Sequence, residues 1–172
     1  KIKGRDAFLS KLSERLQKRY EPKRVNVPEW SYSPQHRVLQ HASKDELLDV
    51  FQKECEAIHT DVYTTTLEQL PIVLDRVIQQ YEGQSIIKWK DERFHDWKLD
   101  TLFEKTLPRR AIEVMEWNEG TREENIEKAE RADIGIAISE YAISESATVV
   151  LLTERNHGRV VNFLPEKSIV LI

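Results

Sequence analysis

The chain has 172 residues, 40% of them hydrophobic and 33% charged, with 26 lysines and arginines against 30 aspartates and glutamates. This length and composition predict a soluble globular protein with one main core. The formal net charge is -4 and both signs are interleaved, which argues against nucleic acid as a main partner. The sequence has no run of 18 apolar residues and no apolar segment behind its basic start, so we expect neither a membrane span nor a secretory signal.

Cysteine and histidine usage limits the chemistry of the chain. Cys55 is the only cysteine, so the chain has no internal disulfide and cannot hold an iron-sulfur cluster with its own cysteines. The five histidines are scattered, without a metal-binding spacing such as HExxH. We therefore expect no metal and no cofactor in this chain, and a cytoplasmic location.

The N-terminal part is expected to form a helix followed by an extended strap. A stripe of four apolar side chains predicts a helix over residues 5–19: Phe8, Leu9, Leu12 and Leu16. Residues 21–42 contain three prolines together with Trp30 and Tyr32, which favours an extended segment laid over the body or over a neighbouring subunit. We assign residues 1–42 to this helix and strap.

From residue 43 onward, helix-like and strand-like segments alternate. Two capping boxes predict helix starts, Ser43 with Glu46 and Thr121 with Glu124. Strands are expected at residues 61–65, 85–90, 111–117, 134–138, 143–153 and 168–172, and helices at residues 43–58, 67–81, 99–107, 121–131 and 159–164. The alternation predicts an α/β domain over residues 43–172, with a three-layer, mainly parallel sheet and helices on both faces.

Two details of the strand pattern carry further expectations. Only eight residues separate the strand at 134–138 from the apolar run at 147–152, which is too few for a helical crossover. We therefore expect these two strands to pair as a hairpin, or one of them to lie at the sheet edge. The sequence stops inside the apolar strand at 168–172, from which we expect a truncated or disordered C-terminal tail.

The main candidate site lies at the start of the run ISESATVVLLT. Glu145 stands there among three hydroxyls, Ser144, Ser146 and Thr148. The same group begins with Ser139, Glu140 and Tyr141, directly after the strand at 134–138, at whose carboxyl end an open parallel sheet binds ligands. A carboxylate at the head of a buried strand is a candidate general base or nucleophile. The alternative interpretation is a solvated strand-edge residue beside a tight turn.

Two other polar segments are weaker candidates. Asn156, Gly158 and Arg159 precede a short predicted helix, where backbone N–H groups and a guanidinium could bind an anion. A reverse turn with a solvated arginine is the alternative. Residues 89–97, in which aromatic and charged side chains alternate, form either a pocket wall or a surface loop fixed by its tryptophans.

The string ADIGIAISEYAISESATVVLLTERNHGRVVNFLP, residues 132–165, resembles the signature of the LUD domain family. The matching positions form three short elements in the family's order: Ala132, Asp133, Gly135 and Ile136, then Ala142, Glu145, Ser146, Ala147 and Thr148, then Gly158, Arg159, Leu164 and Pro165. The departure is Ala147, where many relatives have glycine. Further likeness in PEWSYSPQH and SKDELLDVF extends the resemblance to nearly the whole chain.

The resemblance implies a NagB/RpiA/CoA-transferase-like fold and a role in oxidising L-lactate to pyruvate. It also implies companion subunits that resemble iron-sulfur oxidoreductases and hold the clusters that a chain with one cysteine cannot. The protein is then an accessory subunit without independent activity, and a homo-oligomer is compatible with this role. Two alternatives stay open. One is a CoA- or acyl-transfer enzyme that uses Glu145, by analogy of fold with the CoA transferases. The other is a structural assembly subunit.

Overall fold

The computed structural model describes residues 4–16, 31–118 and 120–172, and contacts divide the chain into a unit up to Gln40 and a unit from His41. In the first unit, α1 (Arg5–Arg15) confirms the predicted helix and buries none of its residues. Trp30 and the first half of the predicted strap lie outside the described residues. The described half is not continuously extended, because it contains turns and the 3-10 helix η1 (Pro34–His36).

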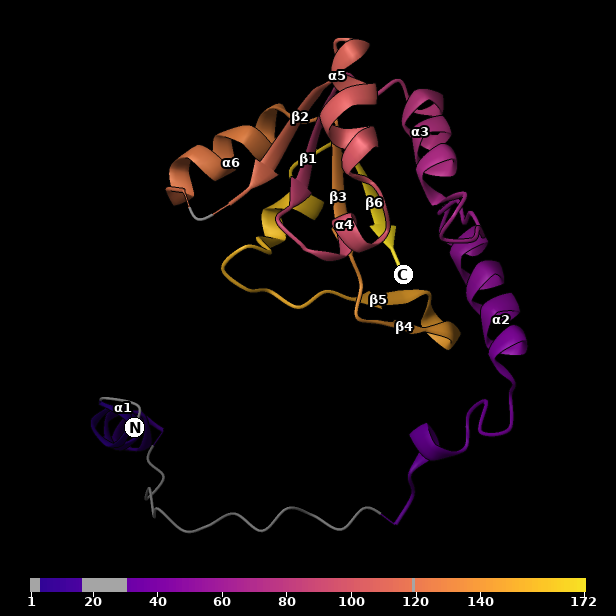
Figure 1. Ribbon diagram of the computed structural model, residues 1–172. Helices are drawn as coiled ribbons and strands as arrows, with labels where there is room; N and C mark the ends of the chain where they lie inside the picture. The colour runs from indigo at the N-terminus through magenta and orange to yellow at the C-terminus, as the bar shows by residue number, and fades with distance from the viewer. Residues whose placement is uncertain (1–3, 17–30, 119) are drawn as a thin grey trace. The chain divides into compact units, whose positions relative to one another are not determined.

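The second unit is built on a four-stranded parallel sheet, as the alternating pattern predicted (Figure 1). Its order is β2-β1-β3-β6, from β1 (Ser85–Trp89), β2 (Glu113–Trp117), β3 (Ile134–Ile138) and β6 (Lys167–Leu171). Every residue of β3 is buried, which agrees with the unbroken apolar run IGIAI in a parallel sheet covered on both sides.

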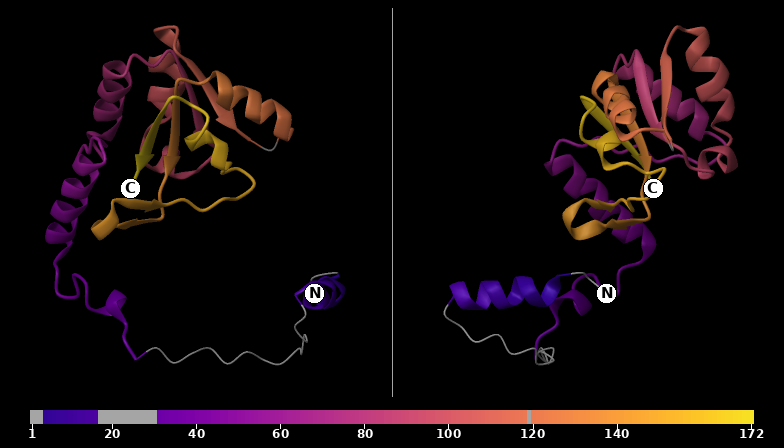
Figure 2. Two further views of the ribbon diagram at one scale, coloured as in Figure 1. Left: turned by 180° about the vertical axis from the view of Figure 1, so that it is seen from behind. Right: turned by 90° about the vertical axis from the view of Figure 1, so that its left-hand side faces the viewer.

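Helices cover both faces of this sheet (Figure 2, right). Between β1 and β2 the chain forms α4 (Arg93–Asp96), the π-helical η2 (Leu102–Thr106) and α5 (Leu107–Arg109); between β2 and β3 it forms α6 (Arg122–Arg131), and η4 (Arg159–Asn162) precedes β6. Adjacent side chains of β1 identify the two faces. Lys88 lies against Phe94 and Phe103 of the first group, whereas Trp89 donates to the carbonyl of Gly158 beside η4.

The remaining helices follow their sequence signals closely. Both capping boxes are formed, at Ser43 before α2 (Lys44–Ala57) and at Thr121 before α6. The helix α3 (Leu70–Gln80) has Pro71 in its first turn, where a missing N–H leaves no helical bond unmade. The segment after β1 becomes helical earlier than predicted, at Arg93 instead of about Leu99.

The strand expected at residues 61–65 is not formed. Its β-prone residues lie in an irregular segment whose side chains bind α3 and the residue after it: Tyr63 donates to Gln80, and Tyr81 donates to Asp61. A strand requires a partner for its backbone groups, and no described strand runs beside this segment. The prediction from β propensity alone was therefore wrong here.

The strand expected at residues 143–153 was also placed wrongly. The chain instead forms a separate antiparallel hairpin, β4 (Tyr141–Ile143), the 3-10 helix η3 (Ser144–Ser146) and β5 (Thr148–Val150). Ser139, directly after β3, contacts both strands of the hairpin, because its hydroxyl accepts from the backbone N–H of Val150 and lies 2.8 Å from the carbonyl of Tyr141. The eight residues after β3 thus provide their own strand and turn, and β5 pairs with β4 instead of β3.

Candidate functional site

The sheet order defines one topological switch point at its carboxyl edge, which we call the crevice. The chain leaves β1 toward β2 and leaves the neighbouring β3 in the opposite direction, toward β6. Where adjacent parallel strands send their connections in opposite directions, the loops part and ligands bind between them. In this chain that position lies between the residues after β1, Lys90 to Arg93, and those after β3, Ser139 and Glu140.

Arg93 is the central side chain at this position. Its Nε donates to Oδ1 of Asp91 at 3.0 Å, and one terminal nitrogen donates to Oδ2 at 2.6 Å. The backbone N–H of Arg93 also donates to Asp91 Oδ1, at 2.9 Å. Only 6% of the Asp91 side chain is exposed, so this two-pronged pair is largely shielded from solvent and holds the guanidinium in one orientation.

His157 holds Asp91 from the other side. Its Nε2 lies 3.2 Å from Asp91 Oδ2, and its ring stacks on Trp89 with 4.6 Å between ring centroids. Burial raises the pKa of the Asp91 carboxyl, but the hydrogen bonds and charge of Arg93, with His157, outweigh burial and leave that pKa below its ordinary value. Asp91 is therefore an anion at neutral pH, and hydrogen bonds to Asp91 raise the pKa of Arg93.

The other terminal nitrogen of Arg93 crosses the crevice. It lies 2.8 Å from Oε1 of Glu140, directly after β3, and the two side chains are 30% and 33% exposed. An ion pair open to water contributes only about 0–1 kcal/mol, so this half of the arginine is bound much more weakly than the half that faces Asp91. The crevice thus has a firmly held cation with one replaceable partner.

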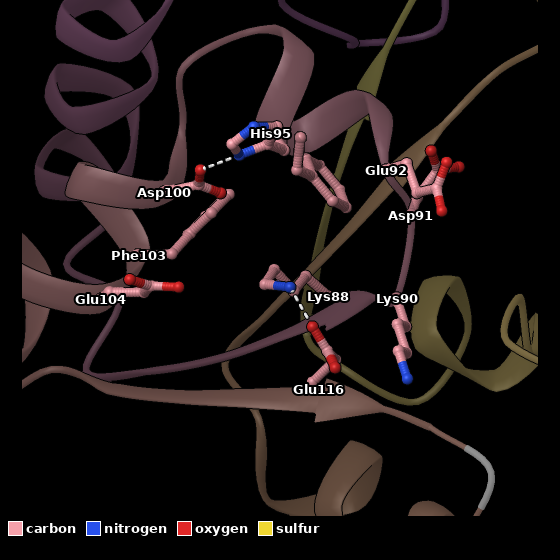
Figure 3. Close-up of a pocket in the computed structure, with 10 residues that line it drawn as sticks. Lys88, Lys90, Asp91, Glu92, His95, Asp100, Phe103, Glu104 and Glu116 are labelled. Carbon is pink, nitrogen blue, oxygen red and sulfur yellow. Dashed lines mark hydrogen bonds and ion pairs between the residues drawn. The ribbon is translucent and has the colours of Figure 1, made fainter.

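A cavity of about 210 Å³ lies beside this cluster, between β1, β2 and the α4 and η2 helices (Figure 3). The ammonium group of Lys88 points to Glu116 and lies over the rings of Phe94 and Phe103, at 5.2 and 5.6 Å. His95 pairs with Asp100 at the rim, and this bond raises the pKa of the imidazole. Five carboxylates line the cavity against two lysines, which disfavours an anionic ligand in its interior.

The structure places the predicted residue Glu145 away from the crevice. Glu145 is exposed in η3, at the tip of the hairpin, where η3 packs against α2 (Figure 1). Ser144, Ser146 and Thr148 lie in the same turn, and the hydroxyls of Ser146 and Thr148 are 2.9 Å apart. The expected position at the mouth of a buried strand was wrong, and the roles assigned to these four residues stay predictions.

The second predicted group lies in the loop over β1 and β2. The carbonyl of Asn156 accepts from the backbone N–H of Lys90 at 3.4 Å, and Gly158 is buried against the ring of Trp117. A Cβ atom on Gly158 would stand 2.2 Å from that ring, so the close contact requires glycine. Arg159 is exposed at the start of η4. This loop reaches the crevice through His157, which contacts Asp91. Glu145 and the three hydroxyls beside it do not reach the crevice.

Glu140 was included in the predicted group around Glu145, whereas Asp91, Arg93 and His157 were not predicted as site residues. The available signals were the general position of ligands at the carboxyl ends of strands and the polar residues that follow β1 and β3. Residues 89–97 were considered as a pocket wall, and residues 88–95 do line the cavity in part. The pairing of Arg93 with Glu140 joins residues 47 apart in sequence, and no local pattern indicates it.

Within residues 4–16, 31–118 and 120–172, no group of three or more histidine, cysteine, aspartate or glutamate side chains is arranged to hold a metal ion. In the same ranges, no helix combines the length and the apolar character that a membrane crossing requires.

An open parallel α/β sheet with a charged crevice at its topological switch point defines the general class of this protein. The sequence matches the LUD domain over residues 48–172, and the chain belongs to the LUD domain family. Among its relatives, lactate utilization protein C of Geobacillus kaustophilus is 39% identical over 99% of this chain and 71% of its own length. The proteins of that name from Macrococcus caseolyticus and Bacillus subtilis are 37% and 35% identical, each over 99% of this chain and 70% and 71% of their own lengths. No solved structure matches the chain.

The structure gives several positions of the family-like string a mechanical explanation. Asp133 accepts from the backbone N–H groups of Gln84 and Ser85, both at 2.8 Å, and so ties the start of β1 to β3. These bonds overcome the effect of burial and lower the pKa of Asp133. A Cβ atom on Gly135 would stand 1.7 Å from the carbonyl oxygen of Val161. These residues therefore hold β1 beside β3 and allow η4 to pack closely on the sheet, and they need not touch a ligand.

Proposed function

We propose that the protein acts in lactate utilization, as an accessory subunit without iron-sulfur clusters in a cytoplasmic system that oxidises L-lactate to pyruvate. The observation that carries the proposal is the identity of 35–39% over 99% of the chain with relatives called lactate utilization protein C. Similarity of this extent includes the crevice, the hairpin and the loop that covers β1 and β2.

The composition of the chain supports an accessory role. Cys55, the only cysteine, is buried in α2, so cysteine-held clusters would have to lie in companion subunits. The companions we propose are iron-sulfur oxidoreductase-like proteins that pass the electrons of lactate to an acceptor. The excess of carboxylates in the cavity supports the same role, because a redox site for the lactate anion is poorly placed among them.

The proposal is tested by deleting the gene in its host and growing the strain with L-lactate as the sole carbon source. We expect growth on lactate to stop, growth on pyruvate to continue, and a plasmid copy of the gene to restore growth on lactate. Growth of the deletion strain on lactate at the normal rate would refute the proposal. Tagged protein should co-purify with cysteine-rich redox proteins, and its isolation without them would refute the companion-subunit part.

The alternative of a CoA- or acyl-transfer enzyme depends on Glu145. A nucleophilic carboxylate requires neighbours that orient it and exclude water. Glu145 is exposed in a 3-10 turn, and its carboxylate has no hydrogen bond or ion pair with the rest of the described chain. We therefore favour the accessory role over the enzyme.

A further inference from the structure

The two sides of the Arg93 guanidinium differ in how they are held. Nε and one terminal nitrogen are bound to Asp91, whose side chain is only 6% exposed and contacts His157. The second terminal nitrogen forms an ion pair with Glu140, at 2.8 Å, where both side chains are about one third exposed. Arginine keeps its charge at any physiological pH, so the guanidinium is a fixed donor at the switch point of the sheet.

We propose that Arg93 is an anion-binding residue and that Glu140 occupies its binding position in the free protein. A small monocarboxylate binds by replacing the Glu140 carboxylate on the outer nitrogen of Arg93, while Asp91 and His157 position the guanidinium from behind. The ligand class rests on the proposed function: short hydroxy or oxo acids such as lactate and pyruvate carry the same carboxylate as the side chain that they replace.

Glu140 is able to leave without disturbing the fold. Its backbone is held independently of its side chain, because its N–H donates to the carbonyl of Val150 at 3.0 Å. The neighbouring Ser139 is also held, by hydrogen bonds to Leu171 of β6 and Val150 of β5. Rotation of one partly exposed side chain into water therefore frees Arg93. The neighbouring cavity is rich in carboxylates, so the charged end of a ligand is directed to Arg93 and only an uncharged end extends past Asp91.

Direct titration of the purified protein tests the proposal. Sodium L-lactate and sodium pyruvate are titrated at constant ionic strength into the unchanged protein and into Glu140→Gln, with binding followed by calorimetry. Glu140 competes with the ligand for Arg93, and removing this competitor lowers the apparent dissociation constant. Because the Arg93–Glu140 pair is exposed and weak, we expect Glu140→Gln to bind up to roughly fivefold more tightly. A Glu113→Gln variant is the matched control, since it frees Arg131 from an ion pair that is also exposed, and it should bind as the unchanged protein does.

Variants of Arg93 distinguish an anion-binding residue from one whose ion pairs only stabilise the fold. In the Glu140→Gln background, Arg93→Met should abolish binding, and Arg93→Lys should recover only part of it because lysine lacks the fork that Asp91 orients. Asp91→Asn should weaken binding when binding is measured well below its melting temperature, where the protein remains folded. If Asp91→Asn does not fold, His157→Gln is measured in its place. A positioning role thus changes affinity in the folded protein, which a purely structural role does not.

Three outcomes would overturn the proposal. The first is equal affinity of the unchanged protein and Glu140→Gln, and the second is binding that survives Arg93→Met. The third is tighter binding of sodium phosphate than of either monocarboxylate, which would refute the ligand class. Because binding is measured on purified protein and the proposed function by growth of a deletion strain, failure of one experiment leaves the result of the other intact.

Discussion

Two polar regions include residues that follow β3, and they differ in how the fold assembles them. The crevice cluster of Asp91, Arg93, Glu140 and His157 joins three separate segments and places Asp91 almost fully inside the protein. The hairpin from β4 to β5 carries Glu145 and three hydroxyls to an exposed tip within a single short segment. The hairpin is thus formed by residues close together in the sequence, whereas the charged site at the sheet edge depends on residues that come together only on folding.

The largest expected effect concerns the support beneath the crevice. Gly135→Ala places a Cβ atom against the backbone carbonyl of Val161, which no side-chain rotation relieves. We expect a loss of about 3 kcal/mol or more in the free energy of unfolding, measured by urea denaturation. In the control Gly120→Ala, the new Cβ atom meets only side-chain ends and no backbone, with Asn118 Oδ1 nearest at 2.8 Å and Glu124 Oε2 at 3.3 Å, and these ends can move. Equal stability of the two variants would contradict this assignment.

The next effect distinguishes the buried pair of the crevice from an exposed pair nearby. Asp91→Ala leaves Arg93 and His157 without their shared partner and should cost about 2–3 kcal/mol, less than a fully buried pair because Arg93 is partly exposed. Asp100→Ala removes a carboxylate that also pairs with a histidine, but an exposed one, and should cost less than about 1 kcal/mol. Similar losses for both would remove the energetic distinction between the pairs.

The pH dependence of stability should follow the carboxyl of Asp91. Its pKa is lower in the folded than in the unfolded state, so it stabilises the fold above its unfolded pKa of about 3.9 and loses this effect as the pH falls through the folded pKa. The difference in stability between the unchanged protein and Asp91→Asn should therefore be constant near neutrality and shrink below about pH 4. A difference that persists in acid, measured by urea denaturation across pH, would contradict this.

A smaller and opposite effect is expected in the hairpin. Ala147 has φ 49° and ψ 34°, the left-handed conformation that costs an L-residue with a Cβ atom about 1 kcal/mol relative to glycine. Ala147→Gly should therefore raise the melting temperature and the free energy of unfolding by somewhat less than that, since glycine is also freer in the unfolded chain. Ala142→Gly, in extended β4, is the control and should destabilise.

The smallest effect is expected at Glu145 itself. Its carboxylate is exposed and unpaired within the described chain, so Glu145→Gln should change stability by less than about 0.5 kcal/mol. Under the accessory role it should also support growth on lactate at the normal rate. A strong growth defect with unchanged stability would favour the transfer-enzyme alternative and reverse the ranking of the two regions.

Local signals in the sequence determined most of the helices and strands. The capping boxes at Ser43 and Thr121, the apolar run of β3 and the alternation that makes a parallel sheet all depend on neighbours within a few residues, and the structure confirms them. The string from Ala132 to Pro165 also identified the family, because it contains the glycines and the aspartate that close packing and strand ends require.

Tertiary structure alone decided the strand partners and the charged crevice. Residues 61–65 have strand propensity but no partner strand in the described chain, and β5 pairs with β4 outside the main sheet. Arg93 meets Glu140 because β1 and β3 are neighbours whose connections part, a relation between segments that no window of sequence contains. Short-range patterns report the energy of local structure, whereas the pairing and burial of charges depend on which distant segments the fold brings together.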